Sequence, residues 1–385
     1  MAPVFRPTWV EVNIETIRQN YKNIKQYVHD TEVIAVVKAN AYGMGLIPVA
    51  GALSGIGCSR FAVATPDEAF ELRASGFTGA VMVIGPAIRS CAPLYVKHDI
   101  ETVCADESFL ERLSECAVEQ GISAKVHYKI ETGLGRSGFA PEDFISKADK
   151  FYSMPGIRAV GIMSHLAVAD EGKNNYTELQ FGRFNKVIKK LEERGFNLGI
   201  RHICNSSATL LYPEMHLDAV RVGKILYGFC PENIKSPVEL RCPFKVRSEI
   251  TSVRKASTGD SFGYGLRYVC RDDDMIAVVP IGYADGYSRM YMGKTHALLH
   301  GRRVPVVGSI CCDQIFIRVT DVPEAAPGDE VILAGRQDDE EIMPDALGSC
   351  IGTSACEAFN MFRGRIPRLY TNGEKSLKEN IYGQQ

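Results

Sequence analysis

The sequence predicts an α/β protein in which a (β/α)8 TIM-type barrel is followed by a mainly β C-terminal domain. Over the first 230 or so residues, short β-branched runs alternate with helical patterns, which is typical of βαβ units around a parallel sheet. From about Cys242 onwards, strand patterns follow one another without helices between them. We therefore expect a barrel domain over residues 1–240 and a β domain over residues 241–385, which the extreme N-terminal strand could join.

Eight strand candidates succeed one another in the barrel region, and eight in a row indicate a closed barrel. They span residues 33–37, 61–64, 81–84, 101–104, 125–130, 160–164, 201–204 and 219–222. The helices between them carry their own signals. Residues 65–68 read Thr-Pro-Asp-Glu, a capping box with proline at the first helical position, and Gly76 ends that helix. Asn13 is a candidate cap for an earlier helix, whose apolar face repeats at Ile17, Tyr21, Ile24 and Val28.

The β domain is predicted from shorter apolar runs separated by Gly, Asp and Pro turns. The expected strands span residues 245–253, 275–280, 297–299, 304–307, 315–319 and 330–333. One helical pattern near residues 344–362 follows, and a loosely held polar tail ends the chain.

Composition favours a small molecule as the partner. The formal charge is −2, from 44 basic and 46 acidic residues without long runs, so neither nucleic acid nor a membrane surface is an expected partner. No apolar run approaches the ~20 residues of a membrane span and no signal peptide is visible, so we expect a cytoplasmic protein. Twelve scattered cysteines without a Cys-x-x-Cys pair indicate thiols in a reducing compartment, and the eight histidines show no metal-ligand spacing.

Chemically active side chains follow the proposed barrel strands, where a barrel carries its functional residues. Lys38, Arg136, His165, Ser206 and the segment 221–223 each lie at or just after a strand. A lysine at the tip of a buried strand can lose its proton and attack an aldehyde, although a lysine that reaches solvent is the simpler reading of Lys38 taken alone.

Segments along nearly the whole chain resemble, in order, the motifs of the alanine racemase family. The matching segments span residues 36–43, 129–138, 164–167, 205–210, 221–223, 226–228, 263–265, 280–287, 311–314 and 365–368. The resemblance implies a pyridoxal 5′-phosphate (PLP) enzyme that supplies D-alanine by racemising alanine. It also implies a homodimer with shared active sites.

The resemblance assigns the two acid/base groups. Lys38 would carry PLP as a Schiff base and exchange a proton on one face of the substrate α-carbon. Tyr264, from the other subunit, would act on the opposite face. Ionising a tyrosine of pKa ~10 at neutral pH costs about 4 kcal/mol, so nearby positive charge is expected.

The resemblance also assigns the cofactor contacts. Arg221 would face the pyridine nitrogen and leave it unprotonated, which weakens the ring as an electron sink and favours racemisation over transamination. The remaining assignments place Arg136 at the phenolic oxygen, His165 beside the ring, and Tyr42, Ser206, Gly223 and Lys224 at the phosphate. Lys129 would be carbamylated and orient Arg136, and the substrate carboxylate would meet Arg136, Tyr283 and Cys312, with Asp313 holding the loop.

Purely structural roles remain alternatives for these residues. Arg221 could form a surface ion pair, Ser206 could cap a helix and Tyr264 could pack in a strand. Lys129 could equally be an ordinary strand lysine, and His165 a hydrogen-bonded core histidine.

Several positions depart from the family pattern. Met44 stands where a histidine is usual, Cys312 replaces a methionine, Ser309 an arginine and Cys356 a tyrosine, and Lys224 is unusual. Loss of the phenol at position 356 should widen the entrance, so a racemase that prefers serine or a larger amino acid is an alternative. Cys356, Ser309, Asp170 and Arg289 are the candidate specificity and entrance residues.

Other classes of protein fit the sequence less well. Gly133 to Gly138 match the Gly-x-Gly-x-x-Gly dinucleotide fingerprint, but too late in the chain and with Pro141 interrupting it. A non-catalytic PLP-binding barrel would lack the second domain. An amino-acid decarboxylase would use a cysteine beside an aspartate, as in Cys311-Cys312-Asp313, but Gln314 and segment 282–287 fit the racemases better.

Overall fold

The computed structural model describes residues 5–230, 234–362 and 364–372. The chain divides into two compact units. The barrel unit comprises residues 17–41 and 45–241, and the β unit comprises residues 1–16, 42–44 and 242–385. The polar tail expected at the end of the chain, residues 373–385, lies outside the described residues.

The barrel unit is built on a parallel sheet of eight strands in its described part. The order in the sheet is β8-β7-β6-β5-β4-β3-β2-β9, so the chain winds steadily round the barrel. The two end strands approach each other through backbone bonds from Asp218 N–H to the Arg201 carbonyl and from Arg221 N–H to the Cys204 carbonyl, both 3.1 Å. The predicted (β/α)8 barrel followed by a mainly β domain is confirmed. The strands are β2 (Glu32–Val36), β3 (Arg60–Val63), β4 (Ala80–Val83), β5 (Glu101–Cys104), β6 (Ala124–Lys129), β7 (Ile157–Met163), β8 (Ile200–His202) and β9 (Ala219–Val222).

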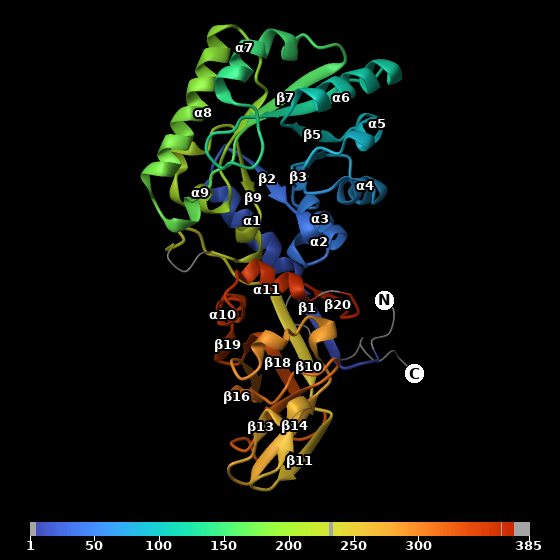
Figure 1. Cartoon of the computed structure of the whole chain (residues 1–385), viewed down its shortest axis with the longest axis vertical. Coiled ribbons are helices and arrows are strands. Elements are labelled where there is room, and N and C mark those ends of the chain that lie inside the picture. The colour runs from blue at the N-terminus through green and yellow to red at the C-terminus, as the bar shows by residue number, and fades with distance from the viewer. Residues whose placement is uncertain (1–4, 231–233, 363, 373–385) are drawn as a thin grey trace. The chain divides into compact units, whose positions relative to one another are not determined.

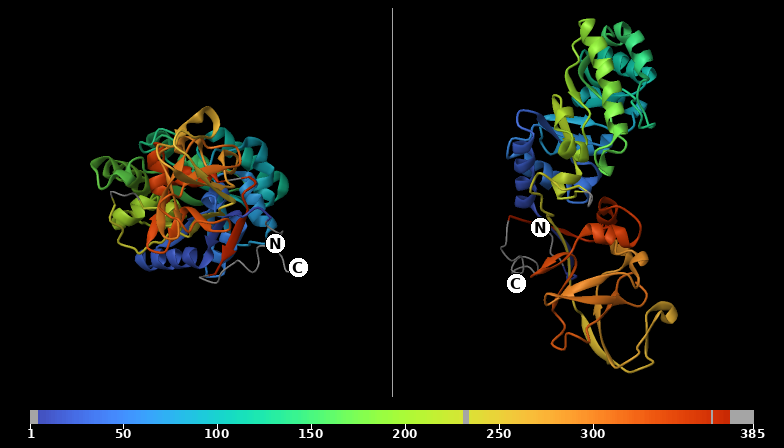
Figure 2. Two further views of the ribbon diagram at one scale, coloured as in Figure 1. Left: turned by 90° about the horizontal axis from the view of Figure 1, so that it is seen from below. Right: turned by 90° about the vertical axis from the view of Figure 1, so that its left-hand side faces the viewer.

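Helices cover the outside of the barrel strands, as Figure 1 shows, and the right-hand view of Figure 2 shows the long helix α8 in yellow-green on that outer surface. The sequence signals for helix ends are borne out. The Thr65 hydroxyl and the Glu68 carboxylate form the capping box of α4, and Asn13 Oδ1 accepts from Thr16 N–H at 3.1 Å. The helices are α1 (Ile14–Tyr27), α3 (Leu46–Ser54), α4 (Pro66–Ala74), α5 (Ala92–Lys97), α6 (Glu107–Gln120), α7 (Pro141–Tyr152), α8 (Asn175–Glu193) and α9 (Ser206–Leu211).

The β unit is built on a mixed sheet that has ten strands in its described part. Strand β1 is antiparallel to β10 and parallel to β20, so the first and the last described strands of the chain pair side by side in this sheet. Its strands are β1 (Thr8–Asn13), β10 (Phe244–Glu249), β11 (Ser252–Ala256), β14 (Asp274–Val279), β15 (His296–Leu299), β16 (Arg302–Val307), β17 (Ile315–Arg318), β18 (Glu330–Gln337), β19 (Glu340–Ile342) and β20 (Arg368–Thr371). A separate two-stranded ribbon consists of β12 (Ser261–Phe262) and β13 (Tyr268–Val269).

Two elements of the β unit differ from the sequence prediction. The single strand expected at 245–253 is two strands, because the chain leaves its partner β18 after Glu249 and pairs with β14 from Ser252. The single helix expected at 344–362 is also two, α10 (Pro344–Cys350) and α11 (Ala355–Met361). Gly352 adopts φ +75 between them, and the Ser354 hydroxyl caps the second helix.

Candidate active site

Four cationic side chains gather at the carboxyl ends of the barrel strands. Lys38 follows β2, and Arg136 lies in the loop between β6 and α7. Burial lowers the pKa of His165 well below 6.5, and the nearby charges of Arg221, Arg136, Lys129 and Lys38 lower it further. These four cationic side chains and His165 therefore share one electropositive site at this end of the barrel. His165 is neutral there at neutral pH.

The backbone that follows Lys38 is strained. Residues Ala39, Asn40, Ala41 and Tyr42 have φ of 53, 55, 53 and 53°, so a left-handed turn of four non-glycine residues adjoins the lysine. The left-handed conformation costs roughly 1–2 kcal/mol per residue for L-amino acids. Surrounding contacts must hold such a turn, and strain of this kind is concentrated at functional sites.

Arg221 is 3% exposed and is held in place by the barrel itself. Its Nη1 donates to the His202 Nδ1 at 2.7 Å and to the His202 carbonyl at 3.1 Å. Its Nη2 lies 2.8 Å from the Ser164 carbonyl, 2.9 Å from the Ile203 carbonyl and 3.1 Å from the His165 Nδ1. Burial lowers the pKa of Arg221 only to about 10, so the guanidinium stays charged at neutral pH. Nε is the guanidinium donor that has no acceptor among the described residues.

A chain of hydrogen bonds runs from Arg221 through the barrel interior to a carboxylate. His202 Nε2 lies 3.0 Å from His127 Nδ1, and His127 Nε2 lies 2.9 Å from Glu101 Oε2. Because a guanidinium can only donate, His202 Nδ1 must accept and its proton must sit on Nε2. His127 Nδ1 then accepts in turn, so His127 also carries its proton on Nε2 and donates it to Glu101. Both imidazoles are therefore neutral Nε2–H tautomers.

Gly161, on β7, allows the hydrogen bond between His127 and His202. Strand β7 lies between β6, which carries His127, and β8, which carries His202. A Cβ at Gly161 would lie 2.2 Å from the His127 Nδ1. The missing side chain therefore lets the His127 ring pass over β7 and reach His202.

Glu101 ends the chain with a negative charge. Burial alone would raise the pKa of Glu101, but the hydrogen bond and charge of His127 and the charges of Arg60 and Lys125 bring it below the ordinary value of 4.5. Arg60 Nη1 lies 3.2 Å from the Glu101 Oε1. The Glu101 carboxylate is thus ionised at neutral pH. The two imidazoles link its negative charge to the buried positive charge of Arg221.

Lys129 is 4% exposed and donates to the Ser137 hydroxyl at 2.7 Å. Burial is the main reason why its pKa is lowered to about 8, the charges of Arg136 and Arg221 contribute, and Glu131 opposes them. Glu131 also shapes the arginine loop, since its carboxylate accepts from Gly133 N–H at 2.6 Å and from Arg136 N–H at 3.3 Å. Lys129 is therefore a buried amine with a substantial unprotonated fraction.

Two of the predicted phosphate ligands lie in contact in the barrel unit. The Ser206 hydroxyl, at the start of α9, accepts from Gly223 N–H at 3.0 Å, and Lys224 follows directly. In the β unit, Tyr42 lies near Cys356, whose charge adds to burial in raising the pKa of Tyr42. Met44 is buried and Asp170 is exposed, in a short helical turn after β7.

Tyr264 is 76% exposed in the single chain. It lies between Gly263 and Gly265, whose φ of +75 and +73° turn the backbone sharply. Ser309, a candidate specificity or entrance residue, donates its hydroxyl to the Tyr264 carbonyl at 2.5 Å. A Cβ on Gly263 would lie 2.9 Å from the Ser309 backbone nitrogen. Ser309 thus holds the turn that presents the tyrosine.

Tyr283, Cys312 and Asp313 lie together in the β unit. A hydrogen bond with Cys312 is the main reason why the pKa of Tyr283 is raised, and Arg289 is close enough to oppose it. Asp313 binds Arg365, which lowers the pKa of the Asp313 carboxyl. Asp313 therefore holds a loop.

A buried carboxylate in the β unit was not among the residues predicted from the sequence. Asp285 is fully buried and accepts from Arg6 at 2.6 Å and from Arg365 Nε at 2.9 Å. His127, His202 and Glu101 were likewise not predicted from the sequence, and Glu68 was predicted only as part of a capping box. The only sequence signal for Asp285 was its place inside the segment 280–287.

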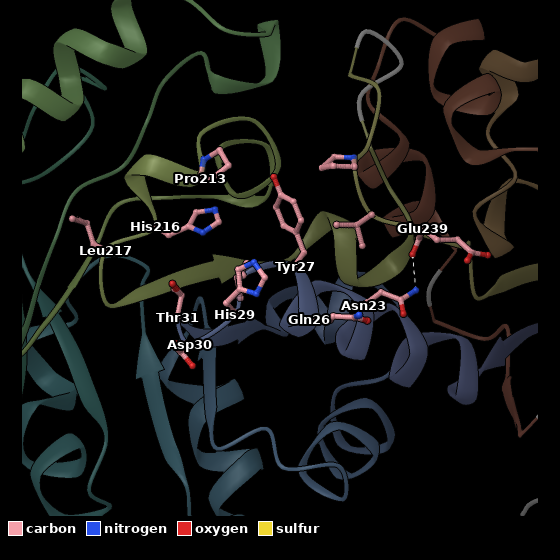
Figure 3. Close-up of a pocket in the computed structure, with 13 residues that line it drawn as sticks. Asn23, Gln26, Tyr27, His29, Asp30, Thr31, Pro213, His216, Leu217 and Glu239 are labelled. Carbon is pink, nitrogen blue, oxygen red and sulfur yellow. Dashed lines mark hydrogen bonds between the residues drawn. The ribbon is translucent and has the colours of Figure 1, made fainter.

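A separate cavity lies elsewhere in the barrel unit. It measures about 940 Å³ and is lined by residues that include Tyr27, His29 and His216, as Figure 3 shows. His29 precedes β2 and His216 precedes β9, so the cavity is at the amino ends of the barrel strands, opposite to Lys38. It is not part of the cationic site.

Other features of the described residues bear on the class of protein. No group of three or more His, Cys, Asp or Glu side chains in this part of the chain is arranged to hold a metal ion. All twelve cysteines are free thiols. None of the helices described is both long and apolar enough to cross a membrane, and the cytoplasmic location stays a prediction.

A parallel barrel with a lysine, two arginines and a neutral histidine at its carboxyl end, joined to a β domain, defines a class of barrel enzymes that bind an anionic cofactor. Models of the alanine racemase N-terminal and C-terminal domains match residues 12–231 and 244–370. The chain belongs to the alanine racemase family and is an isomerase of that family. Matches in both domains set it apart from a barrel-only PLP carrier.

Relatives and solved structures agree with this assignment. Alanine racemase 1 of Clostridium acetobutylicum is 37% identical over 96% of this chain and 97% of its own length. A Clostridium difficile alanine racemase structure has a TM-score of 0.91 at 34% identity and covers 96% of each chain. The alanine racemase structure from Bacillus anthracis with bound L-Ala-P has a TM-score of 0.91 at 31% identity, over 97% of each chain.

Proposed function

We propose that this chain racemises alanine with PLP bound covalently at Lys38, and that Lys38 and Tyr264 are the two groups that exchange the α-proton. The observation that carries the proposal is the buried Arg221, charged, fixed by five acceptors and left with an Nε–H that has no partner in the described chain. An unused donor beside a lysine suits a ring nitrogen that can only accept.

The residues of the barrel unit fit the cofactor. Lys38 would hold its aldehyde carbon, Arg221 Nε would donate to the ring nitrogen, and Ser206, the Gly223 N–H and Lys224 would bind the phosphate, with Tyr42 as a further ligand. The bound cofactor would supply an electron sink for the substrate α-carbon. Arg136 would donate to the phenolic oxygen and His165 would pack against the ring.

Arg221 supports racemisation over transamination. With a pKa of about 10, its guanidinium keeps its proton at neutral pH, so it would give the ring nitrogen of the bound cofactor a hydrogen bond and no proton. A ring that stays unprotonated withdraws electrons less strongly, which disfavours protonation away from the α-carbon. The chain through His202 and His127 to Glu101 stabilises that charged state.

The exposure of Tyr264 supports a shared site. A phenol that is 76% exposed, on a turn braced by Ser309, is suited to act beyond its own chain. We infer a homodimer in which the partner subunit's Tyr264 stands across the substrate from Lys38. The cationic site at the barrel end would lower the cost of ionising that phenol.

Lys129 is proposed to be carbamylated, because only an unprotonated amine adds CO2 and its pKa is lowered to about 8. The resulting anion would accept from Arg136 and orient it towards the cofactor. The substrate carboxylate would meet Arg136, Tyr283 and the backbone near Cys312, and Asp313 would keep that loop in place through Arg365.

Serine is the second candidate substrate. Cys356 lies near Tyr42, and its thiol leaves more room than the phenol usual at that position in the family. Asp170 and Arg289 remain candidate entrance residues. Alanine takes precedence because the relatives named above are alanine racemases.

The test is proton exchange in deuterium oxide. Purified protein with PLP is incubated with L-alanine or L-serine, and the D-enantiomer, α-deuterium and free amine are measured. We expect D-alanine that carries α-deuterium, formed faster than D-serine. Amine released by decarboxylation, or no exchange with either amino acid, would overturn the proposal, and faster serine turnover would replace alanine as the substrate.

A further inference from the structure

The left-handed turn after Lys38 is bonded differently at its two ends. On the later side, the Asn40 carbonyl accepts from Gly45 N–H and the Asn40 Oδ1 accepts from Leu46 N–H, both at 2.8 Å. The Ala41 N–H reaches back to the Val37 carbonyl at 2.8 Å. The N–H groups of Ala39 and Asn40, which come first, have no such backbone acceptor among the residues that the structure describes.

Glu68 provides the acceptor for both. Its Oε1 lies 2.5 Å from the Ala39 nitrogen and 3.3 Å from the Asn40 nitrogen. Glu68 is half-buried, whereas Ala39 and Asn40 are exposed. The two donors belong to the residues directly after Lys38, so the carboxylate caps the turn where the lysine enters it.

The second oxygen of Glu68 serves its own helix. Oε2 accepts from Ala64 N–H at 2.9 Å and from Thr65 N–H at 3.3 Å, and the Glu68 N–H donates to the Thr65 hydroxyl at 3.3 Å. That half of the carboxylate completes the capping box of α4. The cap needs only one oxygen, so the bonds made by Oε1 lie outside its requirements.

We propose that Glu68 is a positioning residue for Lys38, because its carboxylate ties the strained turn beside the lysine to the rigid start of α4. This inference rests on the proposed role of Lys38 as the PLP lysine. Only a carboxylate offers acceptors on both oxygens. A glutamine at this position would turn its NH2 group towards one pair of N–H donors and lose either the cap or the turn. An aspartate would be too short to bridge the two segments.

The variants Glu68→Gln and Glu68→Asp are compared with Thr65→Ala, the matched control. Thr65→Ala removes the hydroxyl acceptor of the same capping box but leaves the Oε1 bonds to Ala39 and Asn40. For each protein the PLP dissociation constant, the pH dependence of the absorbance of bound PLP, and kcat and KM for alanine are measured, together with the melting temperature.

We expect Glu68→Gln to weaken PLP binding about tenfold or more, to shift the midpoint of the absorbance titration and to lower kcat more than it raises KM. Thr65→Ala should lower the melting temperature without changing PLP binding or the midpoint of the absorbance titration. If Glu68→Gln and Glu68→Asp change only the melting temperature, as Thr65→Ala does, Glu68 is merely a helix cap and the inference is wrong.

A second measurement needs no variant. Hydrogen exchange on the PLP-free wild-type protein should show the exposed amides of Ala39 and Asn40 protected, and rapid exchange at both would contradict the inference. Borohydride reduction of the wild-type protein with PLP separates the two levels of the argument. If reduction leaves no label on Lys38, the proposed function fails. A labelled Lys38 with unchanged behaviour in Glu68→Gln leaves the proposed function standing and removes only the role of Glu68.

Discussion

Arg221 donates from Nη1 to the Nδ1 of His202 across 2.7 Å, and this contact fixes the proton of a fully buried imidazole. The donors and acceptors of the next two hydrogen bonds are then also fixed. All the hydrogen bonds in the series from Arg221 to Glu101 therefore point in the same direction. Positive charge at the carboxyl end of the barrel is thereby coupled to a carboxylate on β5. This arrangement makes the protonation states of several buried groups testable.

The tautomers can be observed directly. We predict that His202 and His127 are both neutral, with the proton on Nε2, because Arg221 can only donate and Glu101 accepts. Nitrogen NMR of protein labelled in its histidine rings reports which ring nitrogen is protonated. A His202 protonated on Nδ1, or a doubly protonated His202 at neutral pH, would be incompatible with the chain.

Gly161→Ala should break the chain between its two histidines. The added Cβ would lie 2.2 Å from the His127 Nδ1 and 2.8 Å from the Ile200 carbonyl. Overpacking together with a lost buried hydrogen bond should cost at least about 2 kcal/mol of unfolding free energy, measured by urea denaturation. Gly182→Ala is the matched control, since Gly182 lies inside α8 with no atom within 4 Å of its added Cβ. The control should stabilise by about 0.5–1 kcal/mol. Equal effects of the two changes would refute the close approach at Gly161.

Stability should fall on acidification below about pH 6.5. The pKa values of His165 and His202 lie well below 6.5 in the folded protein, so below that pH the unfolded chain binds protons that the folded chain does not. Their contribution is complete above about pH 6.5 and is lost as the pH falls, by about 1.4 kcal/mol per pH unit for each histidine. His202→Asn should reduce the slope of the unfolding free energy against pH by the equivalent of one proton. His98→Asn, which removes a surface histidine, is the control. An unchanged slope in His202→Asn would show that His202 titrates alike in both states.

Lys129 should make activity depend on CO2. Its pKa of about 8 leaves roughly a tenth of the amine unprotonated at pH 7, and this is the form that adds CO2. Bicarbonate should restore activity lost in CO2-depleted buffer, and Lys129→Gln should be less active and insensitive to bicarbonate. Lys125→Gln, which removes a surface lysine from the same strand, should respond like the wild type. A wild-type enzyme indifferent to CO2 would exclude the modification.

Most of the fold could be predicted from the sequence, whereas the residues that hold the site together could not. Runs of apolar residues marked all eight barrel strands because strand patterning is local. Contacts that form only when the barrel closes have no signal in the local sequence. His127 and His202 are 75 positions apart and meet only because Gly161 lies between them in the sheet.

The same limit applies to single hydrogen bonds. Glu68 was recognised as part of a capping box, but its second oxygen could not be assigned from sequence, because Ala39 is 29 positions away. Ser309 stays a candidate entrance residue, but the hydrogen bond from its hydroxyl to the Tyr264 carbonyl, 45 positions away, could not be predicted from the sequence. The division of strand 245–253 also depends on its neighbours, β18 and β14, and not on its own residues.

The most direct test of the two-base account is the racemisation rate of Tyr264→Phe with PLP bound. The change removes one hydroxyl from an exposed side chain, so the fold and PLP binding at Lys38 should persist. We predict that racemisation falls at least about a hundredfold in both directions, because the proton exchange on one face of the substrate is lost. A phenylalanine variant that racemises alanine as fast as the wild type would contradict the account.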